Sequence, residues 1–332
     1  MSILVVGGAG YIGSHTVRAL VEAGEDVVVL DDLSEGHRAA IPQGVRHIAA
    51  DIQDREDTIG ALVDVRPEAV FHFAAACYVG ESVKDPSSYY HQNVHGTHNL
   101  LDGMRAAGCD QLVFSSTCAV YGEPEQIPIV EDLPKSPVNP YGRTKLHCEG
   151  MFADFHRAYG LRSVSLRYFN AAGAHPSGEI GEDHEPETHL IPLVLQVALG
   201  QRQDIKIFGT DYPTPDGTCI RDYIHIVDLA AAHLAGLKAM REGRANVAAY
   251  NLGNESGHSV QQVIDEARRV TGHPIPAVAV GRRPGDPPKL VGSSALAREE
   301  LGWRPQFADL GAILETAWRW HQAHPRGYDD AS

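Results

Sequence analysis

Short apolar runs alternate with amphipathic segments through the first half of the chain. The runs are rich in Val, Ile and Leu, and they lie at 3–6, 26–30, 45–50, 69–73, 111–116 and 162–169. Helical patterns between them lie at 12–23, 54–64, 87–107 and 141–159. Continuous apolar strands separated by helices are typical of a parallel sheet that is covered on both faces. The pattern therefore predicts an α/β fold, a doubly wound parallel sheet of the Rossmann type.

After residue 170 the chain becomes richer in Pro and Gly. Helices are expected near 190–199, 226–241, 259–271 and 309–323, with short strands at 205–208 and 248–252. We expect a nucleotide-binding domain over 1–170, to which some later segments return, and a smaller mixed α/β domain over 171–332. The smaller domain is expected to cover the carboxyl ends of the strands, where ligands bind in open α/β sheets.

Composition narrows the choice of partner and compartment. The 332 residues carry a formal net charge of −15, which argues against a nucleic-acid partner because phosphate binding needs a basic stripe. No apolar stretch reaches the ~20 residues of a membrane span, and the first strand leaves no room for a secretion signal. The cysteines are odd in number and form no CxxC pair, so we expect neither disulfides nor a metal site, and a cytoplasmic location. These cysteines are Cys77, Cys109, Cys118, Cys148 and Cys219.

A glycine loop directly after the first strand predicts a dinucleotide site. Gly7, Gly10 and Gly13 are spaced as GxxGxxG around Tyr11 and Ile12, and a helix is expected to begin there. Glycines let the backbone approach a diphosphate closely, and a helix start offers unpaired N–H groups. A plain strand-to-helix turn is the alternative interpretation.

Acidic residues after the second strand indicate which dinucleotide binds. Asp31 and Asp32 lie about 20 residues beyond the loop, where a carboxylate accepts hydrogen bonds from the adenosine ribose and repels a 2′-phosphate. NAD is therefore favoured over NADP. Segments after the third and fourth strands are expected to flank the adenine and the middle of the cofactor, unless they are ordinary loop and core residues. They comprise Asp51, Ile52, Phe73, Ala74 and Ala75.

Tyr141 and Lys145 stand four residues apart in the sequence YGRTK. On a helix these positions share one face, so the phenol and the ammonium can meet in one site. A nearby cation favours the phenolate and lowers the tyrosine pKa, which makes the tyrosine a possible general base. Thr117, at the end of the fifth strand, offers a hydroxyl that could face Tyr141 or merely cap a turn. A solvated helix face is the alternative for the Tyr/Lys pair.

The motifs GGAGYIG, FHFAA, SSTCAVYG, YGRTK, RYFNAAGAHPSG and GTCIRDYIHIVDLA occur in this order over essentially the whole chain. Together they resemble the UDP-glucose 4-epimerase branch of the extended short-chain dehydrogenase/reductase family. The resemblance implies reversible 4-epimerisation of UDP-glucose and UDP-galactose through a 4-keto sugar on tightly bound NAD. It makes Tyr141 the catalytic base, Lys145 its pKa-lowering and ribose-binding partner, and Thr117 a hydroxyl on the proton path.

The resemblance also implies further binding residues and a homodimer. It adds Leu33, Ser34, Asn93 and Phe169 to the cofactor residues. The UDP-sugar residues that it implies are Asn170, His189, Leu190, Phe208, Arg221, Arg283, Asp286 and Leu290, besides Thr117 and Tyr141. The dimer would form through helices near 90–107 and 141–159. The apolar positions for this interface are Leu100, Leu101, Met104, Leu146, Met151 and Phe155.

Departures from the family leave alternatives open. Cys77 stands where many relatives have a lysine near the nicotinamide, and Gln92 precedes Asn93 where two asparagines are common. His189 lies in Thr-His-Leu instead of Asn-Asn-Leu, so it contacts the substrate differently or lines the lid.

Related nucleotide-sugar dehydratases and decarboxylases carry acidic groups after the threonine, where this chain has Cys118 and Ala119. Epimerisation therefore remains the preferred reaction. Two alternatives stay open: an epimerase of another UDP-sugar, such as a UDP-N-acetylhexosamine or a UDP-pentose, and a non-catalytic NAD(H)-sensing protein.

Overall fold

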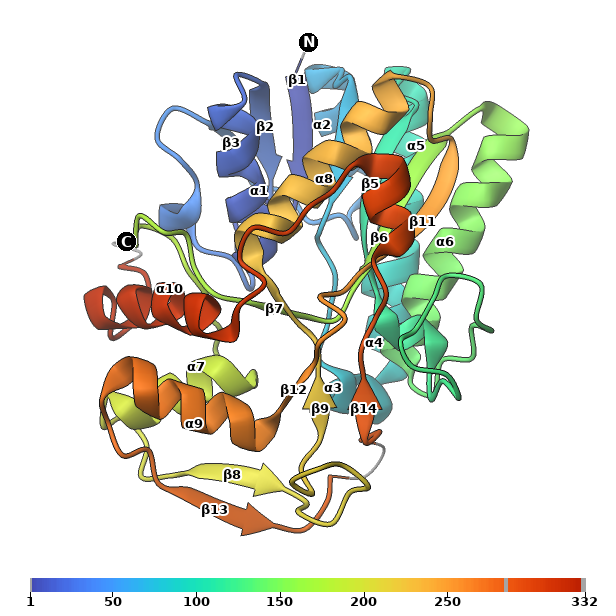
Figure 1. The fold of residues 1–332 in the computed structure, drawn as a ribbon. Helices are drawn as coiled ribbons and strands as arrows, with labels where there is room; N and C mark the ends of the chain where they lie inside the picture. The colour runs from blue at the N-terminus through green and yellow to red at the C-terminus, as the bar shows by residue number, and fades with distance from the viewer. Residues whose placement is uncertain (1, 284–285, 330–332) are drawn as a thin grey trace.

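A seven-stranded parallel sheet forms the centre of the molecule (Figure 1). The computed structural model describes residues 2–283 and 286–329. In the sheet the strand order is β11-β6-β5-β4-β1-β2-β3. All strands are parallel, and the order in which they follow one another along the sheet reverses between β1 and β4. The strands are β1 (Ser2–Val6), β2 (Asp26–Leu30), β3 (Arg46–Ile48), β4 (Ala69–His72), β5 (Gln111–Thr117), β6 (Arg162–Tyr168) and β11 (Val247–Leu252). This is the predicted α/β fold of the Rossmann type.

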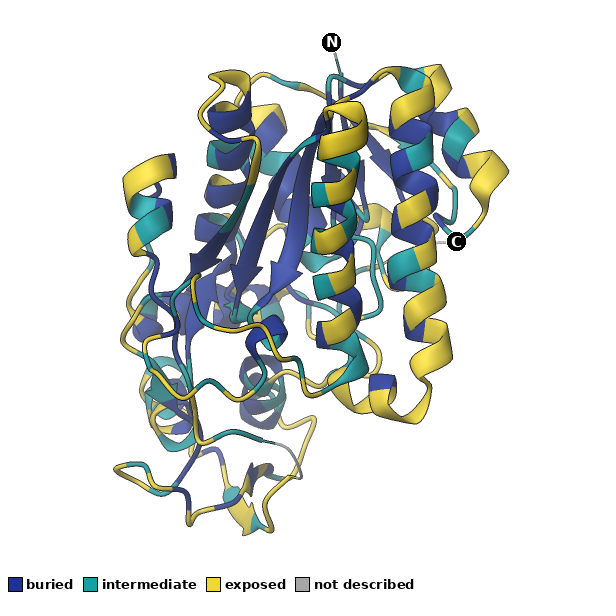
Figure 2. Cartoon of the chain, turned by 90° about the vertical axis from the view of Figure 1, so that its right-hand side faces the viewer, coloured by how far each residue is buried: buried dark blue, intermediate teal, exposed yellow. Residues whose placement is uncertain are grey.

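Side chains of the strands alternate between two apolar layers because successive residues point to opposite faces. In β1, Ile3 and Val5 pack with α1 (Tyr11–Glu22) and α8 (Ile226–Arg241). Leu4 and Val6 pack on the other face. That face is covered by α2 (Arg55–Val65), α5 (Gly96–Ala107) and α6 (Pro140–Tyr159). Figure 2 shows the sheet buried between helices whose outer sides are exposed.

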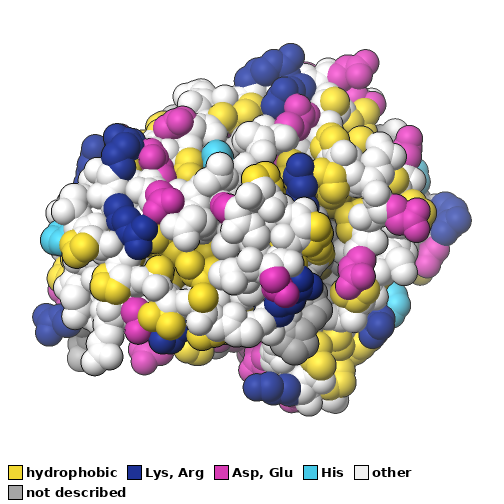
Figure 3. All heavy atoms as spheres, turned by 60° about the horizontal axis from the view of Figure 1, so that its bottom comes forward, with side chains coloured by type: hydrophobic (Ala, Val, Ile, Leu, Met, Phe, Trp, Pro, Cys, Tyr) yellow, Lys and Arg dark blue, Asp and Glu magenta, His cyan; other side chains and the backbone are white. Residues whose placement is uncertain are grey.

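A smaller part lies beyond the carboxyl ends of the strands, with its own apolar core (Figure 1). Its helices are α7 (Leu190–Ala198), α9 (Val260–Thr271) and α10 (Leu310–Ala323), and its parallel strand pair is β8 (Ile205–Phe208) with β13 (Ala277–Val280). Two short sheets join this part to the rest. They consist of β7 (Asn170–Ala172) with β10 (Tyr223–His225), and of β9 (Ile220–Arg221) with β12 (His258–Ser259) and β14 (Lys289–Leu290). On the face nearest this part, acidic and basic side chains are interspersed (Figure 3).

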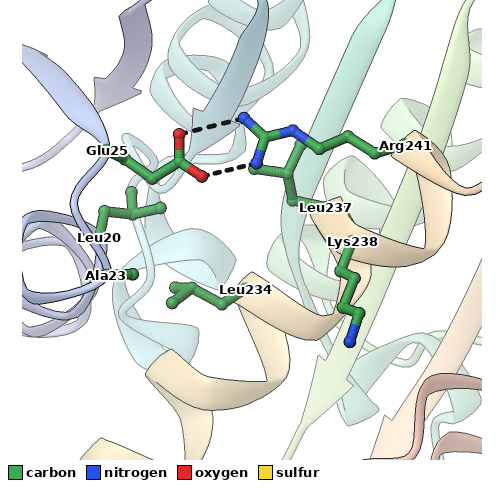
Figure 4. A pocket seen from close by; sticks show the side chains of 7 residues that line it. All are labelled: Leu20, Ala23, Glu25, Leu234, Leu237, Lys238 and Arg241. Atoms are coloured by element: carbon green, nitrogen blue, oxygen red, sulfur yellow. Dashed lines mark hydrogen bonds and ion pairs between the residues drawn. The ribbon is translucent and has the colours of Figure 1, made fainter.

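Two elements that were expected in the smaller domain belong to the central sheet instead. Residues 226–241 form α8, which packs on α1 and covers the central sheet, and residues 247–252 form β11, which pairs with β6 as the edge strand. Both segments are apolar enough for either location, and their partners lie far away in the sequence. Between α1 and α8 the surface has a hollow of about 210 Å³, bordered by the ion pair of Glu25 with Arg241 (Figure 4).

The helix expected over 87–107 is divided in the structure. It comprises α4 (Pro86–Tyr89), a π-helical segment (Tyr90–His95) and α5, preceded by α3 (Val79–Lys84). A second π-helical segment spans Ala297–Leu301, and 3-10 turns occur at Arg38–Ala40 and Cys118–Tyr121. Among the described residues, no helix is both long and apolar enough to cross a membrane.

Candidate active site

Two backbone contacts that only glycine permits shape the loop between β1 and α1. Gly7 has a φ of +78°, and a Cβ there would lie 2.4 Å from the backbone nitrogen of Ala74. A Cβ at Gly13 would lie 2.0 Å from the carbonyl oxygen of Gly7. The start of the helix therefore packs against the loop at Gly7, and the loop packs against the segment that follows β4.

The remaining glycine of the motif faces open space. A Cβ at Gly10 would meet only the Gly7 carbonyl oxygen, at 3.6 Å. Gly10 is the N-cap residue of α1 and supplies no side-chain cap to the turn that begins with Tyr11 and Ile12. Free N–H groups and the partial positive charge of a helix start attract anions. The loop thus fits the diphosphate of a dinucleotide, with room for it above Gly10.

Asp31 lies beside this loop and Asp32 does not. The Asp31 carboxylate is buried and accepts hydrogen bonds from the backbone nitrogens of Ala9 (2.9 Å) and Leu33 (2.8 Å). Burial raises the pKa of Asp31, and these two bonds oppose the rise. Asp32 is exposed, and its Oδ1 accepts from the backbone nitrogen and the hydroxyl of Ser34. The Asp31 carboxylate is therefore the better placed of the two to meet a ribose near the loop.

The other predicted cofactor residues of the first half mostly shape the site through the backbone. Ile52 is 4% exposed and packs against Gly96, whereas the half-buried Asp51 binds the backbone of Gln53. The Phe73 ring packs on His233, 4.8 Å between centroids, so this side chain belongs to the core. Ala74 and Ala75 are half-buried and continue the strand end.

Asn93 fastens the segment after β4 to the start of α6. Its side-chain oxygen accepts from the backbone nitrogen of Ala76 (2.8 Å), and its amide donates to the Ala76 carbonyl and to the Thr144 hydroxyl, both at 3.0 Å. Asn93 is 1% exposed. All its polar atoms bind protein, so it positions the site through this segment.

Tyr141 and Thr117 meet where β5 ends and α6 begins. Pro140 starts α6, and the side chain of Asn139 caps it by accepting from the backbone nitrogen of Gly142 (2.8 Å). Gly142 lies so close to the 3-10 turn that a Cβ would be 2.5 Å from the Ala119 carbonyl oxygen. The Thr117 hydroxyl caps this turn by accepting from the backbone nitrogen of Ala119 at 3.2 Å, and the Thr117 side chain also lies near enough to Tyr141 to oppose the rise of the tyrosine pKa.

Lys145 is buried on the same helix, but its ammonium does not act on Tyr141 as the sequence suggested. The Lys145 Nζ donates to the Ser115 carbonyl oxygen at 3.0 Å, and burial lowers its pKa to about 8. Burial raises the pKa of Tyr141 well above its usual value, and the neighbouring Thr117 side chain only partly opposes this. In the protein without its cofactor, Lys145 does not bring the tyrosine pKa down, because desolvation of the phenol dominates. The expected lowering by Lys145 together with a cationic nicotinamide ring stays a prediction.

A buried polar network behind these residues was not found from the sequence. The Arg167 guanidinium donates to both carboxylate oxygens of Glu149 (2.9 and 2.5 Å) and to the Tyr121 hydroxyl (2.8 Å). The Ser116 hydroxyl donates to the same carboxylate at 2.6 Å, and Tyr121 donates to Asn251 at 2.8 Å. The network joins β5, β6, α6 and β11. Nothing in the local sequence indicates these pairings, because the partners lie 18 to 130 residues apart.

Cys77, which the sequence analysis left out of the site, lies near Tyr141. Its charge is close enough to raise the pKa of the Tyr141 phenol, and its side chain is exposed. The sequence signal was its position three residues after Ala74, on the segment that borders the glycine loop. Tyr11, in that loop, donates from its hydroxyl to the Gly173 carbonyl at 2.6 Å and so ties the loop to the chain after β7.

The expected diphosphate and uridine residues gather on β8, on β9 and on the segment that precedes β14. Arg221 donates to Asp286 at 3.1 Å, and the guanidinium of Arg283 lies 4.6 Å from the centre of the Phe208 ring. Leu290 is paired with Arg221 in the strand register. The structure thus brings together the four residues that the resemblance assigned to the nucleotide and Leu290, which it placed at the sugar.

The remaining predicted residues border this group. The Asn170 amide donates to the Asp222 carbonyl at 3.0 Å, and Phe169 packs on Gly292 and belongs to the same apolar cluster as Leu290. Leu190 is the first residue of α7 and is half-buried. His189 is the N-cap residue of α7, and its Nδ1 lies 2.7 Å from a Glu182 carboxylate oxygen, so it is directed towards its own loop.

A glycine loop for a diphosphate, an acidic residue beside it and a Tyr/Thr/Lys group at the strand ends define a nucleotide-dependent redox enzyme of the short-chain dehydrogenase type. The profile of the NAD dependent epimerase/dehydratase family matches residues 3–253, and the chain belongs to this family. Within the family it lies among the UDP-glucose 4-epimerases, because its close relatives carry that name over their whole length.

Three of these relatives show the extent of the similarity. The UDP-glucose 4-epimerase of Halalkalibacterium halodurans is 55% identical over 99% of this chain and 98% of its own length. A crystal structure of a UDP-glucose 4-epimerase, 51% identical, superposes with a TM-score of 0.97 over 99% of this chain and 100% of its own. The enzyme from Brucella ovis, determined in complex with NAD, is 48% identical with a TM-score of 0.93 over 96% and 97%.

The contact between Gly13 and Gly7 predicts that Gly13→Ala weakens cofactor binding, because the methyl group pushes the start of α1 away from the loop. Denatured wild-type protein should release about one NAD per chain, and the variant clearly less. Gly60→Ala is the control, since no atom lies within 4 Å of a Cβ there, and it should keep NAD and gain about 0.5–1 kcal/mol of stability. Full NAD content in Gly13→Ala would contradict the role of this contact.

The depressed pKa of Lys145 predicts a pH-dependent effect of Lys145→Met on stability. Between about pH 8 and pH 10.5 the unfolded chain binds more protons than the folded one, so wild-type stability rises with pH there. Below pH 8 the cost of the buried charge is fully present. Cofactor-free Lys145→Met should thus be more stable than wild type at pH 7, by about 1–3 kcal/mol, and the difference should shrink towards pH 10.5. A difference independent of pH would refute this explanation.

Proposed function

We infer that the chain catalyses the reversible 4-epimerisation of UDP-glucose and UDP-galactose on tightly bound NAD. The observation that carries this inference is the position of Thr117 beside Tyr141 at the end of β5, in a chain 55% identical to a UDP-glucose 4-epimerase. When bound, NAD supplies an acceptor for the C4 hydride and returns it to the opposite face of the sugar.

The protein's own residues handle the proton and the position of the sugar. Tyr141 takes the proton of the sugar 4-hydroxyl, and Thr117 holds the same oxygen by a hydrogen bond as the 4-keto sugar forms. Lys145 keeps a positive charge near the site, which favours the tyrosinate in the loaded enzyme. Arg221 and Arg283 suit the diphosphate because a guanidinium donates paired hydrogen bonds. Because most of the binding energy comes from contacts with the nucleotide, the hexose is free to rotate between the two hydride transfers.

Absence of acid–base groups after Thr117 favours epimerisation over dehydration. Cys118 follows it, and burial raises the pKa of this thiol to about 12, so it neither donates nor removes a proton readily at neutral pH. Ala119 has no titratable group. A dehydratase would need such groups to act at C5 and C6 of the sugar.

Incubation with UDP-galactose alone tests the function. Formation of UDP-glucose without added NAD supports the epimerase. A 4-keto-6-deoxy product would indicate a dehydratase, and an unchanged substrate would favour a different UDP-sugar or an NAD(H)-sensing protein. The five cysteines, all free thiols, suit a reducing compartment, and we propose the cytoplasm.

Tyr141→Phe should reduce kcat for UDP-galactose by at least about 100-fold, since it removes the general base but leaves the ring in place. NAD content and UDP binding should stay unchanged. Tyr159→Phe is the matched control on the same helix, because Tyr159 is 55% exposed at the far end of α6, and it should keep full activity. A Tyr141→Phe enzyme with most of its kcat would show that another group removes the proton.

Leu290 is proposed to limit which sugars are accepted. It packs in one apolar cluster with Phe169 and lies opposite Arg221 in the strand register. We expect UDP-N-acetylglucosamine to react with a lower kcat/KM than UDP-glucose, and Leu290→Tyr to lower it by a further 10- to 200-fold, the effect of about 1–3 kcal/mol of misfit. Competition between the two sugars measures this, with Lys289→Tyr as the exposed control. An unchanged ratio in Leu290→Tyr would remove this position from consideration.

We propose a homodimer through α5 and α6, although not through all the predicted side chains. Leu100, Leu101 and Met104 are at most 1% exposed and belong to the core of their own chain. Tyr90, in the π-helical segment before α5, and Tyr159, the last residue of α6, remain exposed. Light scattering should give about twice the chain mass of 35.9 kDa, and a concentration-independent mass of one chain would contradict the dimer.

A further inference from the structure

Two glutamates and two histidines converge just before α7. We call them the Glu/His cluster, which consists of Glu182, His184, Glu187 and His189. The His189 Nδ1 lies 2.7 Å from Glu182 Oε1 and 3.4 Å from Glu187 Oε1. The His184 Nδ1 lies 3.5 Å from Glu182 Oε1 and 3.5 Å from Glu187 Oε2. One ligand atom from each side chain thus lies within 4.8 Å of all the others.

Three of the four side chains are more buried than the side chains of ordinary surface ion pairs. Glu182 is 3% exposed, and the side chains of Glu187 and His184 are 6% and 14% exposed, whereas the side chain of His189 is 46% exposed. Glu182 Oε1 and His184 Nδ1 are buried atoms without a hydrogen bond in proper geometry, although each lies near an atom of opposite character. Buried polar atoms without hydrogen bonds are rare in folded proteins. These atoms therefore point into the cluster as if towards a common centre.

The distances match the shell of a bound metal ion. Zinc lies about 2.0–2.2 Å from histidine nitrogen and carboxylate oxygen in a tetrahedral site, which places neighbouring ligand atoms roughly 3.3 Å apart. Three nitrogen–oxygen distances among Glu182 Oε1, Glu187 Oε2 and the two histidine Nδ1 atoms are 2.7–3.5 Å. Glu187 also accepts from the backbone nitrogens of Thr188 and His189, both at 2.7 Å, through Oε1. Its Oε2 is then left for a metal, and the two backbone bonds hold the carboxylate in place.

We propose that the Glu/His cluster binds one divalent transition-metal ion, for which zinc is the best match. Imidazole nitrogens select this class of ion over calcium and magnesium, which prefer oxygen ligands. Four protein ligands give a closed coordination shell, typical of a structural and not a catalytic site. The cysteine pattern predicted no metal site, but these ligands are all histidine and glutamate within eight residues.

The site would fasten the segment before α7 to the cofactor loop. The His184 ring packs edge-on against Tyr11 of the glycine loop, 6.1 Å between ring centres. The Trp320 ring nitrogen donates to the Glu182 carbonyl at 3.2 Å, which anchors the other side of the segment to α10. A metal ion that holds Glu182 and His184 together would thus stabilise the contact between the smaller part and the cofactor site. This role is independent of the reaction catalysed.

Zinc titration of the purified holoenzyme tests the proposal. After dialysis against EDTA, the protein is titrated with zinc in competition with a colorimetric chelator. Wild type should bind one equivalent with a Kd below about 1 μM. His184→Gln and His189→Gln should each weaken binding by more than about 100-fold, because partners that only orient a ligand already contribute about 10- to 100-fold.

His91→Gln is the control for adventitious binding. His91 and His95 are exposed and stacked on one helix face, 4.9 Å between ring centres, a spacing that can bind metal weakly at the surface. This variant should keep the tight equivalent. Failure of wild type to bind zinc tightly would overturn the proposal, and so would tight binding that persists in both His184→Gln and His189→Gln.

Anomalous scattering at the zinc edge, from wild-type crystals soaked in zinc, avoids any dependence on variants that fold poorly. A peak should lie about 2.0–2.2 Å from the Nδ1 atoms of both His184 and His189. A zinc-soaked crystal without a peak at this position would show that the histidines only pair with the glutamates. Neither measurement uses turnover, so the metal site and the epimerase activity are tested separately.

Discussion

The buried pair of Arg167 and Glu149 holds together the elements that form the reactive part of the site. Arg167 comes from β6 and Glu149 from α6, and the carboxylate also receives the Ser116 hydroxyl from β5. A buried charge left without its partner costs about 3–5 kcal/mol, so neither residue is easily lost alone. The 3-10 turn that follows Thr117 is fixed through Tyr121 on the same guanidinium. Thr117 and Tyr141 face each other because these elements cannot shift independently.

Desolvation sets the charge states of the proposed catalytic pair, Tyr141 and Lys145, in the protein alone. Burial disfavours the charged state of any group, so the pKa of Tyr141 rises while that of Lys145 falls. The tyrosine is therefore neutral at pH 7. The lysine, with a pKa of about 8, is still mostly charged at pH 7 but loses its proton more easily than an exposed lysine. A base that becomes effective only when the positive charge of the oxidised cofactor is present restricts proton removal to the loaded enzyme. This arrangement follows from burial, and it needs no further regulatory element.

The sequence predicted what is encoded locally. Strand β1, the glycine loop and the start of α1 lie within thirteen residues. A continuous apolar run followed by the glycine spacing is sufficient to find them. The Tyr141–Lys145 spacing was also local. The predictions that failed depend on distant partners. The sequence did not show whether α8 covers the sheet or belongs to the lid, or whether Leu100 faces a second chain or its own core. It also did not show which atom accepts the hydrogen bond of the Lys145 ammonium. Amphipathic patterns show that a face is buried but do not identify the surface that buries it.

The position of β11 has a consequence for how the chain folds. Strand β6 is a central strand only because β11, synthesised some eighty residues later, pairs along its outer edge. Until residue 252 leaves the ribosome, β6 presents unpaired N–H and C=O groups that invite pairing with another chain. The first half of the protein is thus a complete domain in its topology but not in its hydrogen bonding. A fragment that ends near residue 170 would expose this edge, and aggregation would then compete with folding.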